Sequence, residues 1–161
     1  MNEVVYLKLP VAIDAPIANV IKKLNKNDLL TTYCCAGHED AYVVYINNGK
    51  QENVKEHTDE TSLYISFAYT ENTKDFLEYV EKTLDSMISH VFGCIIEKDN
   101  KTTYVSNLKY YNRIIIEKYD NDFTIRIKYN TNKFLKNQTY CIKFLNKIIK
   151  NYINDKKSKT K

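Results

Sequence analysis

The segment LTTYCCAGHEDAY, Leu30 to Tyr42, concentrates the residue types in this chain that do chemistry. It holds two thiols, an imidazole, two carboxylates, two threonine hydroxyls and one of only three glycines. The pattern indicates a strand, a tight turn and a second strand. Backbone N–H groups at such a turn can approach an anion or a base edge, and nearby side chains can add hydrogen bonds. The ligand-binding candidates are Thr31, Thr32, Cys35, Gly37 and His38.

An ordinary strand with a solvated turn explains the same residues equally well. In that interpretation Gly37 adopts a left-handed turn conformation and the acidic tip is simply hydrated. Arg113 is a further binding candidate, because Tyr110 and Tyr111 precede it and aromatic rings beside a guanidinium can stack bases. With 14 tyrosines in the chain, packing on a strand surface is an alternative explanation of these rings.

A zinc site is a second interpretation of the turn. Cys35 and His38 have the spacing C-x2-H, and a later pair, His90 and Cys94, has the spacing H-x3-C. Together they supply the four ligands of a Cys2His2 tetrahedron. The alternative is a helix-capping histidine at position 90 and a buried thiol at position 94.

A nucleophilic cysteine is a third interpretation, with Cys34 or Cys35 activated by His38. Thiols at adjacent strand positions point to opposite faces, so at most one of them can meet the imidazole. The sequence identifies no third residue to orient the base, and the acidic pair Glu39–Asp40 has no second acidic cluster opposite it. We therefore assign no catalytic residue.

Motifs and charge narrow the classes of function. The chain lacks the phosphate-binding patterns GxxxxGK[ST] and GxGxxG. It has 24 basic and 20 acidic residues, but four of the lysines lie in the terminal KKSKTK, so the rest of the chain is balanced. Proteins that hold duplex nucleic acid typically show a basic stripe, so strong non-specific DNA binding is disfavoured. The scarcity of arginine beside abundant Asn, Ile and Tyr is typical of an AT-rich genome, such as that of a low-GC bacterium or its phage.

Hydrophobic periodicity predicts one α+β domain over residues 1–154 and a flexible basic tail over 155–161. We expect a largely antiparallel or mixed sheet with about three helices covering one face. The expected strands are residues 3–9, 29–34, 41–46, 63–69, 91–97, 113–119 and 122–129. The expected helices are 15–26, capped by Asp14, a second one capped by Asn72 or Thr73, and 134–153. The polar segment 47–61 is expected to be a solvated connection, a candidate lid.

The sequence also predicts a cytoplasmic protein with no membrane partner. No apolar run reaches the roughly 18 residues of a membrane helix. The N-terminus carries an acidic residue where a secretory signal carries basic ones. Edge strands and abundant tyrosine are compatible with a homo-oligomer.

The stretch from helix 15–26 through LLTTYCCAGH to the strand AYVVYI resembles the tRNA wybutosine-synthesizing methyltransferase family, whose motif reads T-T-S-S-C-S-G-R. Thr31, Thr32, Cys35 and Gly37 match that motif, and His38 stands in place of its arginine. The CCxGH pattern is also similar to that of small uncharacterised proteins of clostridia and their phages. The resemblance implies a nucleotide-accommodating fold and, for an enzyme of that family, S-adenosylmethionine as cofactor and tRNA as partner.

Three functions follow as hypotheses. The first is a protein that binds a nucleotide-like small molecule at the turn and sequesters or senses it, for example an immune signal if the gene is viral. The second is an S-adenosylmethionine-dependent enzyme that modifies tRNA or a nucleotide. The third is a zinc-stabilised interaction module.

Overall fold

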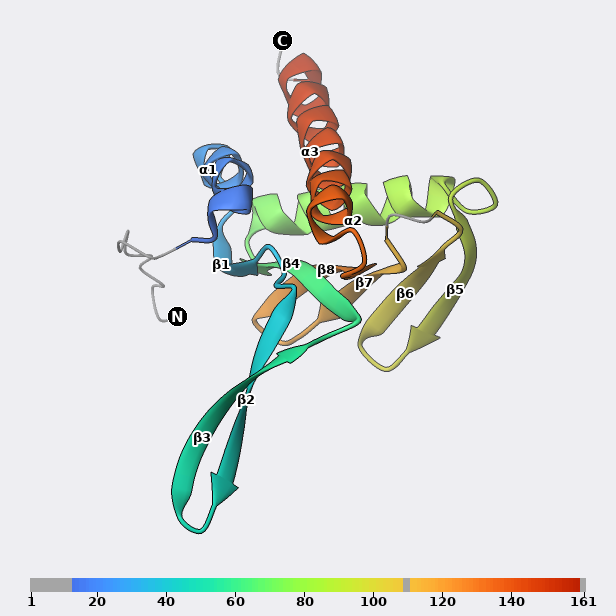
Figure 1. Ribbon diagram of the computed structural model, residues 1–161. Coiled ribbons are helices and arrows are strands. Elements are labelled where there is room, and N and C mark those ends of the chain that lie inside the picture. The colour runs from blue at the N-terminus through green and yellow to red at the C-terminus, as the bar shows by residue number, and fades with distance from the viewer. Residues whose placement is uncertain (1–12, 109–110, 160–161) are drawn as a thin grey trace.

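A six-stranded sheet with three helices on one side forms the body of the molecule (Figure 1). The computed structural model describes residues 13–108 and 111–159, so the strand expected at 3–9 and Tyr110 lie outside the described residues. The sheet order is β1-β4-β8-β7-β6-β5, and every neighbouring pair is antiparallel. The strands are β1 Thr31–Cys35, β4 Glu60–Ala68, β5 Phe92–Lys98, β6 Lys101–Ser106, β7 Arg113–Lys118 and β8 Asp122–Asn130. The predicted α+β class is confirmed.

The pairing of β4 with β8 forms the centre of the core. Alternate residues of β4 are apolar and fully buried, and each faces a buried apolar residue of β8. Phe67 stacks on Phe123 with their ring centroids 5.0 Å apart, and Phe76 of helix α2 packs on the ring of Phe67. Strict alternation therefore fixes the register, because a slip of one residue would turn these rings to the other face.

Two of the three helices begin differently from the predictions, whereas the last begins at Phe134 as expected. A 3-10 turn, η1 Ala15–Ile17, leads into α1 Ala18–Lys26, and Asp14 precedes it without making a side-chain cap hydrogen bond. Helix α2, Glu71–Ser86, is capped by Thr70, whose side chain accepts from the backbone of Thr73 in a reciprocal capping box. Asp14 therefore occupies the N-cap position of η1, but its side chain does not cap the helix as predicted, because its carboxylate accepts from the backbone of Ala36.

Helix α3, Phe134–Lys159, extends beyond its predicted end. Residues 155–159 of the expected flexible tail are helical, and Lys156 reaches Asp75 of α2 at 2.8 Å. The hydroxyl of Tyr152 donates to the same carboxylate at 2.7 Å. These two contacts join the last turns of α3 to α2, which explains why the helix continues into a lysine-rich segment.

The polar segment 47–61, expected as a solvated connection, instead contains a strand, so this prediction was wrong. β2, Asp40–Asn47, and β3, Lys50–His57, pair along their whole length as a separate two-stranded sheet. Asn48 and Gly49 join them with φ of 50° and 74°, the left-handed pair that a tight hairpin turn requires. We call this hairpin, residues 40–57, the arm, because it projects away from the body (Figure 1).

The face of the sheet opposite the helices holds a polar network around the buried carboxylate of Glu117. The carboxylate of Glu117 accepts from Arg126 Nε at 2.8 Å and from the hydroxyl of Tyr119. The guanidinium of Arg126 lies over the ring of Tyr64, 4.7 Å from its centroid. Burial alone would raise the pKa of the Glu117 carboxyl, but the hydrogen bonds from Tyr119 and Arg126 hold it below the usual value.

We expect Glu117 to make the free energy of unfolding depend on acid pH. Its folded-state pKa lies below that of the unfolded chain, so its contribution is complete above a pH of about 4.5 and is lost as the pH falls through the folded-state pKa. Glu117→Gln should remove this part of the loss of stability at acid pH. At neutral pH it should lower the free energy of unfolding by about 1–3 kcal/mol, because Arg126 loses its charged partner.

Urea unfolding of the wild type and the variant at several pH values measures both effects. Glu97→Gln, at an exposed position of β5, is the matched control and should change little. Parallel stability-against-pH curves for the wild type and Glu117→Gln would contradict the prediction.

Candidate functional site

The turn between β1 and the arm is built around Gly37. Its φ is +91°, and a Cβ added there would lie 2.3 Å from the hydroxyl oxygen of Tyr129. Both observations require glycine, the first because side chains disfavour the left-handed region and the second because no space is left. Cys35, Ala36 and His38 therefore take their positions from a turn that no larger residue at position 37 could form.

Two buried side chains of the body hold the carbonyl groups of this turn. The hydroxyl of Tyr129, on β8, donates to the carbonyl oxygen of Ala36 at 2.7 Å. Gln138, on α3, donates from Nε2 to the same oxygen at 3.1 Å. Both side chains are buried, so the turn is fixed from β8 and from α3 at once.

The backbone N–H groups of the turn also have partners. Ala36 N donates to Asp14 Oδ2 at 2.9 Å, Gly37 N points at the Cys35 sulfur at 3.4 Å, and His38 N donates to Thr61 Oγ1 at 3.0 Å. An anion at these N–H groups would therefore have to displace a carboxylate, a sulfur and a hydroxyl already bound there. The backbone N–H groups that were expected to bind an anion are therefore already bound by groups of the protein itself.

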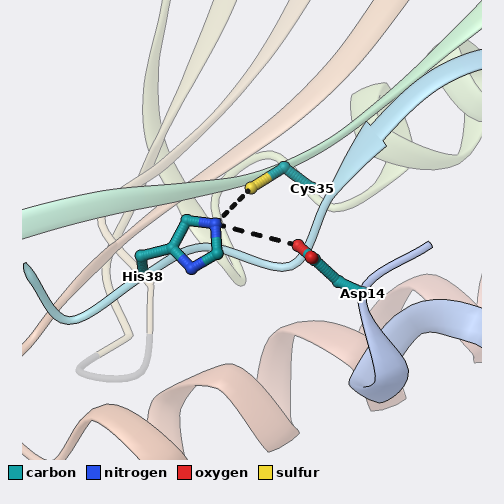
Figure 2. Close-up of side chains that lie close together, drawn as sticks. All are labelled: Asp14, Cys35 and His38. Carbon is teal, nitrogen blue, oxygen red and sulfur yellow. Dashed lines mark hydrogen bonds and ion pairs between the residues drawn. The ribbon is translucent and has the colours of Figure 1, made fainter. Parts of the chain in front are cut away.

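Asp14, Cys35 and His38 bring three different donor atoms to one place (Figure 2). One oxygen, one sulfur and one nitrogen all lie within 4.8 Å of one another. The Cys35 sulfur is 3.4 Å from His38 Nε2, and the same nitrogen is 3.9 Å from Asp14 Oδ2. Two of these residues flank the turn, and the third precedes η1, so distant parts of the chain meet here.

This arrangement differs from that of a nucleophilic cysteine. In a triad the carboxylate orients the histidine through one ring nitrogen while the other faces the nucleophile. Here both dashed contacts in Figure 2 end on the same nitrogen, Nε2. Burial, together with the nearby Asp14, raises the pKa of the Cys35 thiol, against the lowering effect of the Gly37 N–H. A thiol with a raised pKa is protonated at neutral pH, which disfavours it as a nucleophile.

The same arrangement agrees with the donor set of a zinc ion. Zinc binds Cys, His and carboxylate ligands at about 2.0–2.3 Å, so donor atoms on a tetrahedron lie about 3.3–3.6 Å apart. Two of the three separations, 3.4 Å and 3.9 Å, are close to that value, and the third lies within 4.8 Å. Three ligands leave one tetrahedral position, and the side chain of His38, 67% exposed, opens the site to solvent on that side.

The zinc site predicted from Cys35, His38, His90 and Cys94 is wrong. Cys35 ends β1 and Cys94 lies on β5, and these strands form opposite edges of the six-stranded sheet. His90 lies in the turn before β5, on the side of the sheet away from β1. Asp14, which sequence reasoning took for a helix cap, is the residue that accompanies Cys35 and His38.

The remaining candidates lie apart from this cluster. Thr31 exchanges two hydrogen bonds with Asn25 of α1, and Thr32 is exposed on β1. Arg113 lies on β7, with β4 and β8 between it and β1, and its guanidinium binds Glu60 at 2.9 Å. The structure thus brings together Cys35, Gly37 and His38 of the predicted set.

Two surface cavities of the described chain lie away from the Cys35 and His38 side chains. One, of about 200 Å³, lies between α2 and α3 and includes Asp75 and Tyr152. The other, of about 510 Å³, lies at the base of the arm beside His57, Asp59 and Lys133. Cys35 ends the edge strand β1 and the His38 side chain is largely exposed, so their contact lies near the surface at this edge of the sheet.

Comparisons of this chain with protein-family models, curated proteins and solved structures found no match. The resemblance to the wybutosine-synthesizing methyltransferases, and with it S-adenosylmethionine and tRNA, stays a prediction. Within residues 13–108 and 111–159, none of the helices has the length and apolar content to span a bilayer.

We expect Gly37→Ala to destabilise the protein far more than Gly49→Ala. Both glycines have positive φ, so each substitution costs about 1 kcal/mol of backbone strain. Only the Cβ at position 37 meets another atom, the Tyr129 hydroxyl, whereas nothing lies within 4 Å at position 49. The overlap should add about 1–3 kcal/mol.

Thermal or urea unfolding of the two variants provides the comparison. Equal losses of stability would mean that the turn can move away from Tyr129, contrary to the packing described above.

Proposed function

We propose that this protein is a zinc-stabilised interaction module, in which Asp14, Cys35 and His38 hold one zinc ion at the base of the arm. The observation that supports this proposal is the convergence of three chemically different donor atoms from two separate segments. A thiolate, an imidazole and a carboxylate form a donor set that suits zinc better than it suits magnesium or calcium, which prefer oxygen ligands alone.

The zinc ion would act chiefly as a cross-link. It joins the residue before η1 to the turn that follows β1, and the arm begins at Asp40, two residues after His38. Because the ligands are separated in the unfolded chain, the free energy of binding becomes free energy of folding. The direction in which the arm leaves the body would therefore be fixed by the metal as well as by Tyr129 and Gln138.

The surroundings of the ligands support a positioned site. Asp14 is oriented by the N–H of Ala36, and the Cys35 sulfur accepts from the N–H of Gly37. This hydrogen bond opposes the rise in the Cys35 pKa that burial and Asp14 cause, and a bound metal would displace the thiol proton. Such contacts hold ligand atoms near their working positions before the metal arrives.

The arm supplies the interaction surface of the proposed module. Val44 and Ile46 have exposed fractions of 53% and 80%, and Tyr45 and Val54 are exposed on the other face of the hairpin. A two-stranded hairpin that packs on no third layer is marginally stable in water. Apolar residues on such a hairpin are best explained by a partner that covers them.

We expect isothermal titration calorimetry to find one zinc ion bound per chain. Cys35→Ser, Asp14→Asn and His38→Ala should each weaken binding by at least about tenfold, because each removes a ligand atom. Zinc at about 100 times its dissociation constant should stabilise the wild type by about 2.7 kcal/mol and leave Cys35→Ser nearly unchanged.

Matched controls are available at the far edge of the sheet. Cys94→Ser and His90→Ala remove the same side-chain types at positions remote from the site, and both should bind zinc as the wild type does. The proposal fails if the wild type binds no zinc, or if Cys35→Ser and Cys94→Ser bind it with the same affinity.

A further inference from the structure

The outer edge of β2 is an unpaired strand edge without the usual protection. β2 pairs with β3 on one side only, and in the described chain no strand of the body pairs with its other side. Natural proteins protect such edges with charged residues, proline or bulges. Residues 41–47 of β2 contain no charge and no proline, whereas β3 has Lys50, Glu52, Lys55 and Glu56 among its eight residues.

The geometry of the turn identifies which backbone groups this edge offers. In a hairpin closed by two residues, the flanking pair, here Asn47 and Lys50, is hydrogen-bonded, and the pattern alternates from there. The N–H and C=O groups of Asn47 and Tyr45 therefore point toward β3. Those of Val44 and Ile46 point to the open side, where they are available to another strand.

We propose that a second copy of this chain pairs with this edge, β2 against β2 in antiparallel orientation. In an antiparallel pair, outward-pointing residues of one strand must face outward-pointing residues of the other. A two-fold axis between the copies therefore lies where one residue faces the same residue of the other copy, and not midway between two sequence positions. Val44 is the outward-pointing residue at the centre of the uncharged run 42–46. An axis there places every residue of the run opposite another uncharged residue.

Charge and shape favour a second copy over another kind of partner. The only acidic residue of β2, Asp40, would face Asn48 of the other copy in this register, so like charges do not meet. The pairing joins two marginal hairpins into one four-stranded sheet, with the charged β3 strands at its outer edges. The exposed side chains of Val44 and Ile46, on one face of the run, are then partly covered by their symmetry-related neighbours.

This inference names the partner of the arm, so it rests on the interaction role proposed above, but it does not require the zinc ion. Sedimentation velocity on the full chain over a range of concentrations should detect a dimer. Val44→Pro removes one outward N–H in each copy, at the axis, and should weaken the dimer by at least about tenfold. Asn53→Pro is the matched control, because Asn53 faces Val44 in the hairpin and lies on the other outer edge.

The two proline variants separate loss of the edge from loss of the arm. Asn53→Pro should remain dimeric, and in the wild type the amide exchange of Val44 and Ile46 should slow with rising concentration while that of Asn53 does not. A chain that is monomeric at every concentration, a dimer that survives Val44→Pro, or equal dissociation by both variants overturns the inference. Repeating the measurement with the zinc chelator EDTA keeps the two proposals distinct: a dimer without zinc binding contradicts only the metal site, and zinc binding without a dimer contradicts only the pairing.

Discussion

The hydroxyl of Tyr129 occupies the space that a side chain at position 37 would need, and the candidate site and the arm both depend on this contact. Tyr129 is fully buried on a central strand, so its hydroxyl is held where the sheet places it. The turn must approach it closely, because the carbonyl of Ala36 accepts its hydrogen bond. From that fixed turn, Cys35 and His38 face each other and β2 departs from the body.

The candidate site and the arm therefore both depend on the same packed turn. The contacts of Ala36 with Asp14, Tyr129 and Gln138 bring four parts of the chain to a single residue: the segment before α1, the end of β1, β8 and α3. Asp14 is drawn to the turn by a backbone N–H, and not by charge alone. The three donor atoms therefore meet because the turn is packed, and a metal would strengthen an association that packing already produces.

The sequence predicted most of the body because its strands are rich in apolar residues, which recur at alternate positions of β4 and β8. The Ile residues of β7 and the alternating Phe and Ile residues of β8 indicated the hairpin, and the stripe Phe76, Val80 and Leu84 indicated helix α2. The polar strand β3 was missed because hydrophobic periodicity says nothing about a strand whose two faces both meet water. The Asn48–Gly49 pair was the available signal, since this dipeptide is typical of two-residue hairpins. β6 was missed as well, although Thr102, Thr103 and Val105 favour strands.

The candidate site was predicted only in part, and the reason is topological. Cys35 and His38 are three residues apart, so a turn between them was enough to predict their meeting. Asp14 joins them through tertiary packing, and nothing in its neighbours distinguishes a helix cap from a residue bound to a distant N–H. The pairing with His90 and Cys94 failed because spacing says nothing about strand order, and the order places β1 and β5 at opposite edges.

The position of the arm within the chain has a consequence for the order of folding. β1 and β4 pair with each other across residues 36–59, and nearly all of that interval is the arm. Closing the Asn48–Gly49 turn first brings Asp40 beside His57, which shortens the effective loop that β1 and β4 must close. The hairpin can then zip from its tip toward Cys35 and Tyr64, so that a long-range ladder forms through a series of local steps.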